Sequence, residues 1–133
     1  MPALAIFFTA IIIAYDALTA TIARAVGVSY DSFLVLAWVL FFVMGVLAGR
    51  KFGWPGLIVV ALAAALDATL GWYIAAAIGP GYVPGWTART LVVLALERGL
   101  LSIAIATAGV FIGRRSSPPS RHVRAPAARN PYV

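Results

Sequence analysis

Four ionisable side chains interrupt stretches of the sequence that are otherwise apolar: Asp16, Asp67, Glu97 and Arg98. Carboxylates and a guanidinium in apolar surroundings can bind a proton or a cation, or can pair with one another. One interpretation is therefore a proton- or cation-responsive site. The other is a structural ion pair with hydrogen-bonded acids that fix how the helices pack. Because an isolated charge in lipid is costly, we expect Arg98 to pair with Asp16 or Asp67.

Other residue types that carry chemistry are scarce. The chain has no Cys and a single His, His122. A thiolate centre, a pair of axial haem histidines and a histidine-based zinc site are thereby excluded. The sequence also has neither a phosphate-binding Gly loop nor a Ser-His-Asp set with a usable His. We predict a protein without metal or cofactor that is not an enzyme.

The elements that carry the four charges must be membrane-spanning helices, because the chain is too apolar for a soluble domain. Of its 133 residues, 63% are apolar and 11% charged, whereas soluble domains have about 45–50% and about 25%. A spanning helix needs about 20 mainly apolar residues. Four stretches qualify, at residues 3–23, 32–49, 55–78 and 90–112. The predicted fold class is therefore all-α, a bundle of four transmembrane helices.

Basic residues gather on one side of this topology. Seven fall on the side of the two termini, and only Arg24 and Arg89 fall on the other. Lys and Arg in short loops stay in the cytoplasm, so we predict that both termini are cytoplasmic. We also expect the seven to bind anionic lipid headgroups: Arg50, Lys51, Arg114, Arg115, Arg121, Arg124 and Arg129.

The two ends of the chain need separate interpretations. The bundle is expected to occupy residues 1–113, and the Arg- and Pro-rich residues 114–133 to form a disordered cytoplasmic tail. Nucleic-acid binding is not expected of this tail, because no aromatic residues are interleaved with its charges. At the other end, Ala23-Arg24-Ala25 has the form of a signal-peptide cleavage site. No basic residue precedes the apolar run, which favours a retained first helix.

The two halves of the sequence resemble each other. Residues 15–19 (YDALT) are similar to residues 66–70 (LDATL), and both halves end on Gly-x-x-x-Gly followed by two basic residues, at 45–51 and 109–115. This pattern predicts two helical hairpins of the same orientation, related by an axis along the membrane normal. Chance similarity between two Ala-, Val- and Leu-rich segments is the alternative.

Glycines at a spacing of four can bring helix backbones close together in lipid. The candidates for such packing are Gly45 with Gly49, and Gly109 with Gly113. Their partner helix can belong to the same chain or to another subunit, and the sequence leaves both open.

The segments AGRKFGWPG at 48–56 and DATLGW at 67–72 resemble small four-helix bacterial membrane proteins. The resemblance covers mainly the second and third apolar stretches. It implies a bacterial cytoplasmic membrane and no particular activity. Small multidrug exporters have a similar length and number of spans. They place a Glu in the first helix, where this chain has Asp16, but their surrounding motif is missing here.

These features favour a small integral membrane protein of non-enzymatic, accessory or interaction type. Such a protein would pack against itself as a homo-oligomer or against a larger membrane complex. The alternative is a small ion- or proton-coupled transporter or channel that acts as an oligomer. An enzyme would have to work with the four intramembrane ionisable residues alone.

Overall fold

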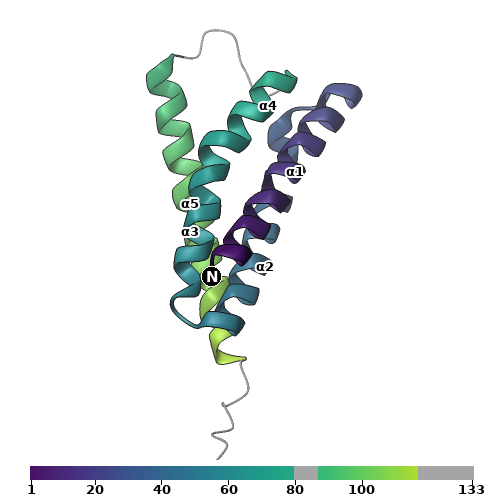
Figure 1. Ribbon diagram of the computed structural model, residues 1–133. Coiled ribbons are helices and arrows are strands. Elements are labelled where there is room, and N and C mark those ends of the chain that lie inside the picture. The colour runs from purple at the N-terminus through teal and green to yellow at the C-terminus, as the bar shows by residue number, and fades with distance from the viewer. Residues whose placement is uncertain (80–86, 117–133) are drawn as a thin grey trace, which may run out of the picture.

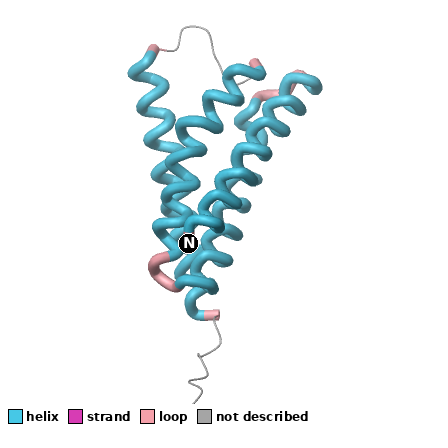
Figure 2. Tube along the Cα trace, viewed as in Figure 1, coloured by secondary structure: helices cyan, strands magenta, loops and turns pink. Residues whose placement is uncertain are grey.

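The computed structural model describes residues 1–79 and 87–116, and nearly all of them are helical (Figures 1 and 2). The elements in chain order are α1 (Pro2–Val26), the 3₁₀ turn η1 (Tyr30–Phe33), α2 (Leu34–Phe52), α3 (Gly56–Leu66), the π-helical turn η2 (Asp67–Gly71), α4 (Trp72–Ile78) and α5 (Ala88–Arg115). The predicted all-α fold is confirmed.

Four helical spans are long and apolar enough to cross a membrane, at Pro2–Val26, Tyr30–Phe52, Gly56–Ile78 and Ala88–Arg115. The protein is therefore a multi-pass membrane protein. The third span is α3, η2 and α4 joined end to end, so its predicted single helix contains a widened turn. The last span is longer than predicted and takes Arg115 into its final turn. The predicted tail beyond residue 116 lies outside the described residues.

Local sequence explains where the first and last spans are bounded. α1 ends at Gly27, whose backbone is left-handed (φ 73°) and whose N–H donates to the Ala23 carbonyl. Glycine adopts this conformation without the steric cost of a Cβ. α5 begins after Thr87, whose hydroxyl accepts a hydrogen bond from the Thr90 N–H. Such a side-chain acceptor satisfies one of the free donors at a helix start.

The helices lie close together at one end of the bundle and spread apart at the other (Figure 1). We call the first the basic end, because Arg50, Lys51, Arg114 and Arg115 lie there, and the second the far end. A buried core joins the helices toward the basic end. Its largest fully buried side chains are Phe8, Ile12, Phe41, Val59, Val60 and Val110.

The contact between α2 and α5 is the most extensive in the bundle, and the four glycines singled out from the sequence make it. All four are buried. A Cβ added at any of them would overlap a backbone carbonyl oxygen of the other helix: Gly45 against Ala106, Gly49 against Val110, Gly109 against Phe42 and Gly113 against Val46. These glycines therefore pack within the chain, where only an absent side chain permits so close an approach.

Toward the far end, the packing of α5 is much looser. Among the described residues, the backbone of α5 runs close to α2, α3 and η2 but not to α1 or α4. α1 and α4 are tied together there by Arg24, whose Nη1 donates to the Ile78 carbonyl at 2.7 Å. The far half of the bundle thus has room for a polar pocket between α5 and the other helices.

Candidate functional site

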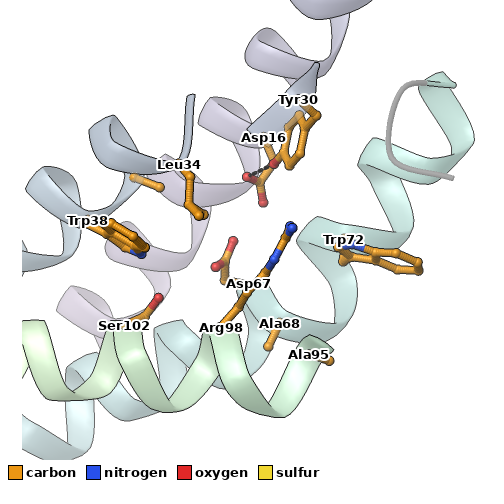
Figure 3. A pocket seen from close by; sticks show the side chains of 11 residues that line it. Asp16, Tyr30, Leu34, Trp38, Asp67, Ala68, Trp72, Ala95, Arg98 and Ser102 are labelled. Atoms are coloured by element: carbon orange, nitrogen blue, oxygen red, sulfur yellow. Dashed lines mark hydrogen bonds between the residues drawn. The ribbon is translucent and has the colours of Figure 1, made fainter. Parts of the chain in front are cut away.

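A small pocket of about 50 Å³ lies inside the bundle, on the far side of the core (Figure 3). A single water needs about 10–15 Å³ on this scale, so the pocket has room for a small ion or a few waters. Every span contributes to its lining, which consists of Asp16, Tyr30, Leu34, Ala37, Trp38, Asp67, Ala68, Trp72, Ala95, Arg98 and Ser102. The structure thereby brings three of the four predicted ionisable residues to one place.

Asp16 is the most deeply buried charged residue of the pocket. Its side chain is only 4% exposed. The Tyr30 hydroxyl donates to Asp16 Oδ1 at 2.6 Å. Asp16 Oδ2 is buried, accepts no hydrogen bond from an N–H or hydroxyl group of the described residues, and faces the Asp67 carboxyl group, with which it can share a proton. Buried polar atoms in folded proteins are nearly always paired, and an exception calls for an explanation such as an ion or a water.

Asp67 faces the same space from the third span. It opens the widened turn η2, which Gly71 closes. A Cβ on Gly71 would overlap Asp16 Oδ2 and would lie 2.9 Å from Asp67 Oδ1. The two carboxyl groups are therefore close neighbours, and both lie against Gly71, which has no side chain to separate them. Single widened turns of this kind often occur at functional sites in helices.

Arg98 reaches the pocket from α5, but its ion-pair partner is Asp31. Arg98 Nη2 lies 2.6 Å from Asp31 Oδ1, and no other ion pair joins the described residues. The direct ion pair of Arg98 is thus with Asp31 and not with the predicted Asp16 or Asp67, although the Arg98 charge acts on Asp67 in the same pocket. Asp31 is 60% exposed and Arg98 is 25% exposed. An ion pair between partly exposed groups loses less solvation than a fully buried pair would.

Neither Tyr30 nor Asp31 was singled out from the sequence, because both fall in the predicted loop between the first two spans. They are consecutive residues of η1, whose start is stabilised by the Ser29 hydroxyl accepting from the Asp31 N–H. Tyr30 holds Asp16 of α1, and Asp31 holds Arg98 of α5. One short turn thus fixes two helices around the pocket. The signal for it in the sequence is a Tyr-Asp pair next to a span that contains no charge.

Glu97, the fourth predicted residue, is exposed and does not line the pocket. It precedes Arg98 in α5, and successive helix residues point about 100° apart. With Arg98 facing the pocket, Glu97 is directed toward the outside of the bundle. The predicted set of four is therefore divided by the structure into three pocket residues and one surface residue.

The basic end has its own cluster of cations and rings. The guanidinium of Arg114 lies 4.5 Å from the centre of the Trp54 ring, and that of Arg115 lies 4.0 Å from the centre of the Phe111 ring. Such contacts orient a cation on an aromatic face. The predicted headgroup residues Arg121, Arg124 and Arg129 lie outside the described residues.

The groups that line the pocket are suited to binding a proton or a cation. Two carboxylates in a low-dielectric site repel each other when both are charged, so such a pair commonly holds a proton or a cation between its members.

No protein-family model matches the chain, and the searches of curated proteins and of solved structures found no match. The pocket is therefore the feature from which a function has to be inferred.

Proposed function

We propose that the protein is a small ion- or proton-coupled transporter or channel, and that Asp16 and Asp67 bind the transported or coupling ion. The observation that carries this proposal is the Asp16 carboxylate, which is 4% exposed and whose Oδ2 faces a second carboxyl group, that of Asp67. Two facing carboxyl groups in a buried site repel each other unless a proton or a cation lies between them, and this requirement favours the transport alternative over the accessory one.

The surroundings of the pair suit reversible binding of a proton or a small monovalent cation. Tyr30 supplies one hydrogen bond to Asp16, while Ser102 offers a hydroxyl in the pocket lining. Burying an ionisable residue inside a membrane costs free energy, so such residues are rare, and those that occur often mark ion and proton pathways. Arg98 adds a positive charge to the lining and so limits how strongly the pair holds a cation.

The setting we propose is a bacterial cytoplasmic membrane with both termini in the cytoplasm, on the anionic lipid surface. Arg50, Lys51, Arg114 and Arg115 at the basic end support this orientation, because basic residues favour the cytoplasmic side. The pocket then lies in the half of the bilayer that faces away from the cytoplasm.

We further propose that the chain consists of two repeated hairpins. Reciprocal contacts support the repeat: Gly45 meets Ala106 while Gly109 meets Phe42, and Gly49 meets Val110 while Gly113 meets Val46. The equivalent acids Asp16 and Asp67 also meet each other across the bundle. Contacts of this kind are expected when a two-fold axis relates two halves.

Ion flux into proteoliposomes tests the proposal. Purified protein is reconstituted into vesicles that contain a pH-sensitive or sodium-sensitive dye, and flux is driven by a potassium diffusion potential or a sodium gradient. We expect ion flux above that of empty vesicles. In Asp16→Asn and Asp67→Asn the flux should fall about tenfold or more, because the ion loses a charged ligand; a tenfold fall corresponds to about 1.4 kcal/mol. Both substitutions keep the size of the side chain and remove its charge.

The matched control is Glu97→Gln, which removes a carboxylate outside the pocket, keeps the size and hydrogen-bonding capacity of the side chain, and should leave flux per folded protein unchanged. Absence of proton, sodium and potassium flux in the parent protein would refute transport by this pocket. The accessory role, which stays a prediction from the sequence, would then be pursued through the proteins that co-purify in mild detergent.

A further inference from the structure

Glu97 carries a charge where a membrane protein rarely exposes one. It precedes Arg98, which lines the intramembrane pocket, so the two residues lie at about the same depth. Glu97 is exposed, and no ion pair or hydrogen bond is formed by its side chain within the described parts of the chain. A carboxylate that faces acyl chains at this depth is costly, and such residues in membrane proteins almost always face protein or water.

The face of α5 around Glu97 has the composition of a helix contact surface. Leu101, Ala104 and Ala108 follow Glu97 at steps of four, three and four residues, so the four side chains share one side of the helix. All four are exposed. Ala104 and Ala108 are one turn apart and small, which allows another helix to approach closely, and polar residues stabilise such contacts in lipid. α5 is also the least buried of the four spans.

We propose that this face of α5, formed by Glu97, Leu101, Ala104 and Ala108, binds the same face of a second copy of this chain. Copies inserted in one membrane share one orientation, so each presents Glu97 at the same depth. A two-fold axis along the membrane normal, the commonest symmetry of oligomers, brings the two carboxyl groups together. Two carboxyl groups at such a distance can share one proton in a hydrogen bond. Lipid chains offer Glu97 no such partner.

This dimer is independent of the ion site, because Glu97 lies outside the pocket lining. Gly45, Gly49, Gly109 and Gly113 are not available for it, since each is already packed against the backbone of the other helix within the chain. The remaining small residues on the outer face of α5 are therefore the ones that a second helix meets.

Cross-linking in native membranes tests the proposal directly, because the chain has no Cys of its own. Single substitutions Ala104→Cys and Ala108→Cys place a thiol on the proposed face, and a disulfide forms only when two Cα atoms come within about 7 Å. We expect both variants to yield covalent dimers on mild oxidation. The control is Leu62→Cys, an exposed position on α3, which should stay monomeric. No dimer at either Ala position, or equal dimer formation at Leu62, overturns the proposal.

A second comparison isolates the role of Glu97. In the Ala104→Cys background, Glu97→Gln should keep the cross-link, because an amide both donates and accepts, whereas Glu97→Leu should reduce it about fivefold or more. Thermal unfolding of the detergent-solubilised monomer should be the same in both variants. Undiminished cross-linking in Glu97→Leu contradicts the carboxyl contact. If Glu97→Leu does not fold, the comparison of Ala104→Cys with Leu62→Cys still decides whether the face is an interface.

Discussion

At the scale of single residues, side chains with the same functional group have different surroundings in the structure. Asp16 is buried in the pocket and held by Tyr30, whereas Glu97 is a carboxylate at similar depth that is exposed. Arg98 forms its direct ion pair with Asp31, while the buried acids share its pocket. Burial, and not residue type, therefore distinguishes the candidate ion ligands from the candidate interface residue.

Tyr30→Phe removes the hydroxyl that donates to Asp16 Oδ1 at 2.6 Å. Asp16 Oδ1 would then be a buried acceptor that has lost its hydrogen bond. We expect the free energy of unfolding to fall by about 1–3 kcal/mol, the usual cost of leaving a buried acceptor unsatisfied. Thermal unfolding in detergent measures the change. Tyr73→Phe is the matched control, because Tyr73 is 72% exposed. Equal stability of both variants would show that the Tyr30 hydrogen bond contributes nothing.

At the scale of elements, the glycines of α5 differ in what surrounds them. Gly109 lies against the backbone of α2, where an added Cβ would overlap the Phe42 carbonyl oxygen. At Gly99 the nearest atom to an added Cβ is the Ala68 Cβ, at 3.4 Å, an ordinary contact distance. The same residue type in the same helix thus serves close packing at one position and leaves space at the other.

Gly109→Ala should therefore lower the free energy of unfolding by about 1–3 kcal/mol or more, the range for overpacking a tight contact, because a backbone cannot move aside as a side chain can. Gly99→Ala should be neutral or stabilising, since Ala is favoured over Gly in helices by about 1 kcal/mol. Chemical or thermal unfolding in one detergent compares the two variants. A Gly109→Ala variant as stable as Gly99→Ala would contradict the close α2–α5 packing.

At the scale of the whole molecule, the bundle is tightly packed at its basic end and open toward its far end (Figure 1). The core and the glycine contact hold the basic half together. In the far half, the described contacts of α5 are sparse, and the Asp31–Arg98 ion pair joins it to η1. This asymmetry places the pocket on the open side of the core.

The proposed orientation predicts that the chain ends in the cytoplasm. A reporter enzyme that is active only outside the cytoplasm, fused after Val133, should be silent, because the basic end is expected to stay inside. The same reporter inserted after Gly79, at the far end, should be active. The opposite pattern of activity would reverse the topology and place the pocket in the cytoplasmic half of the bilayer.

Much of this fold could be predicted from the sequence, because its determinants are local. The length and hydropathy of each apolar stretch decide that it spans a membrane as a helix. The spacing of Gly45, Gly49, Gly109 and Gly113 indicated helix packing for the same reason: residues four apart share a helix face whatever the tertiary structure.

Only the tertiary structure decided which side chains meet. The rotation of each helix about its axis is set by packing against its neighbours, and this rotation turned Arg98 toward the pocket and Glu97 away from it. The short turn η1 brought Tyr30 to Asp16 and Asp31 to Arg98. Partners far apart in sequence depend on helix rotation and on the reach of long side chains, and neither quantity is encoded by local hydropathy or spacing.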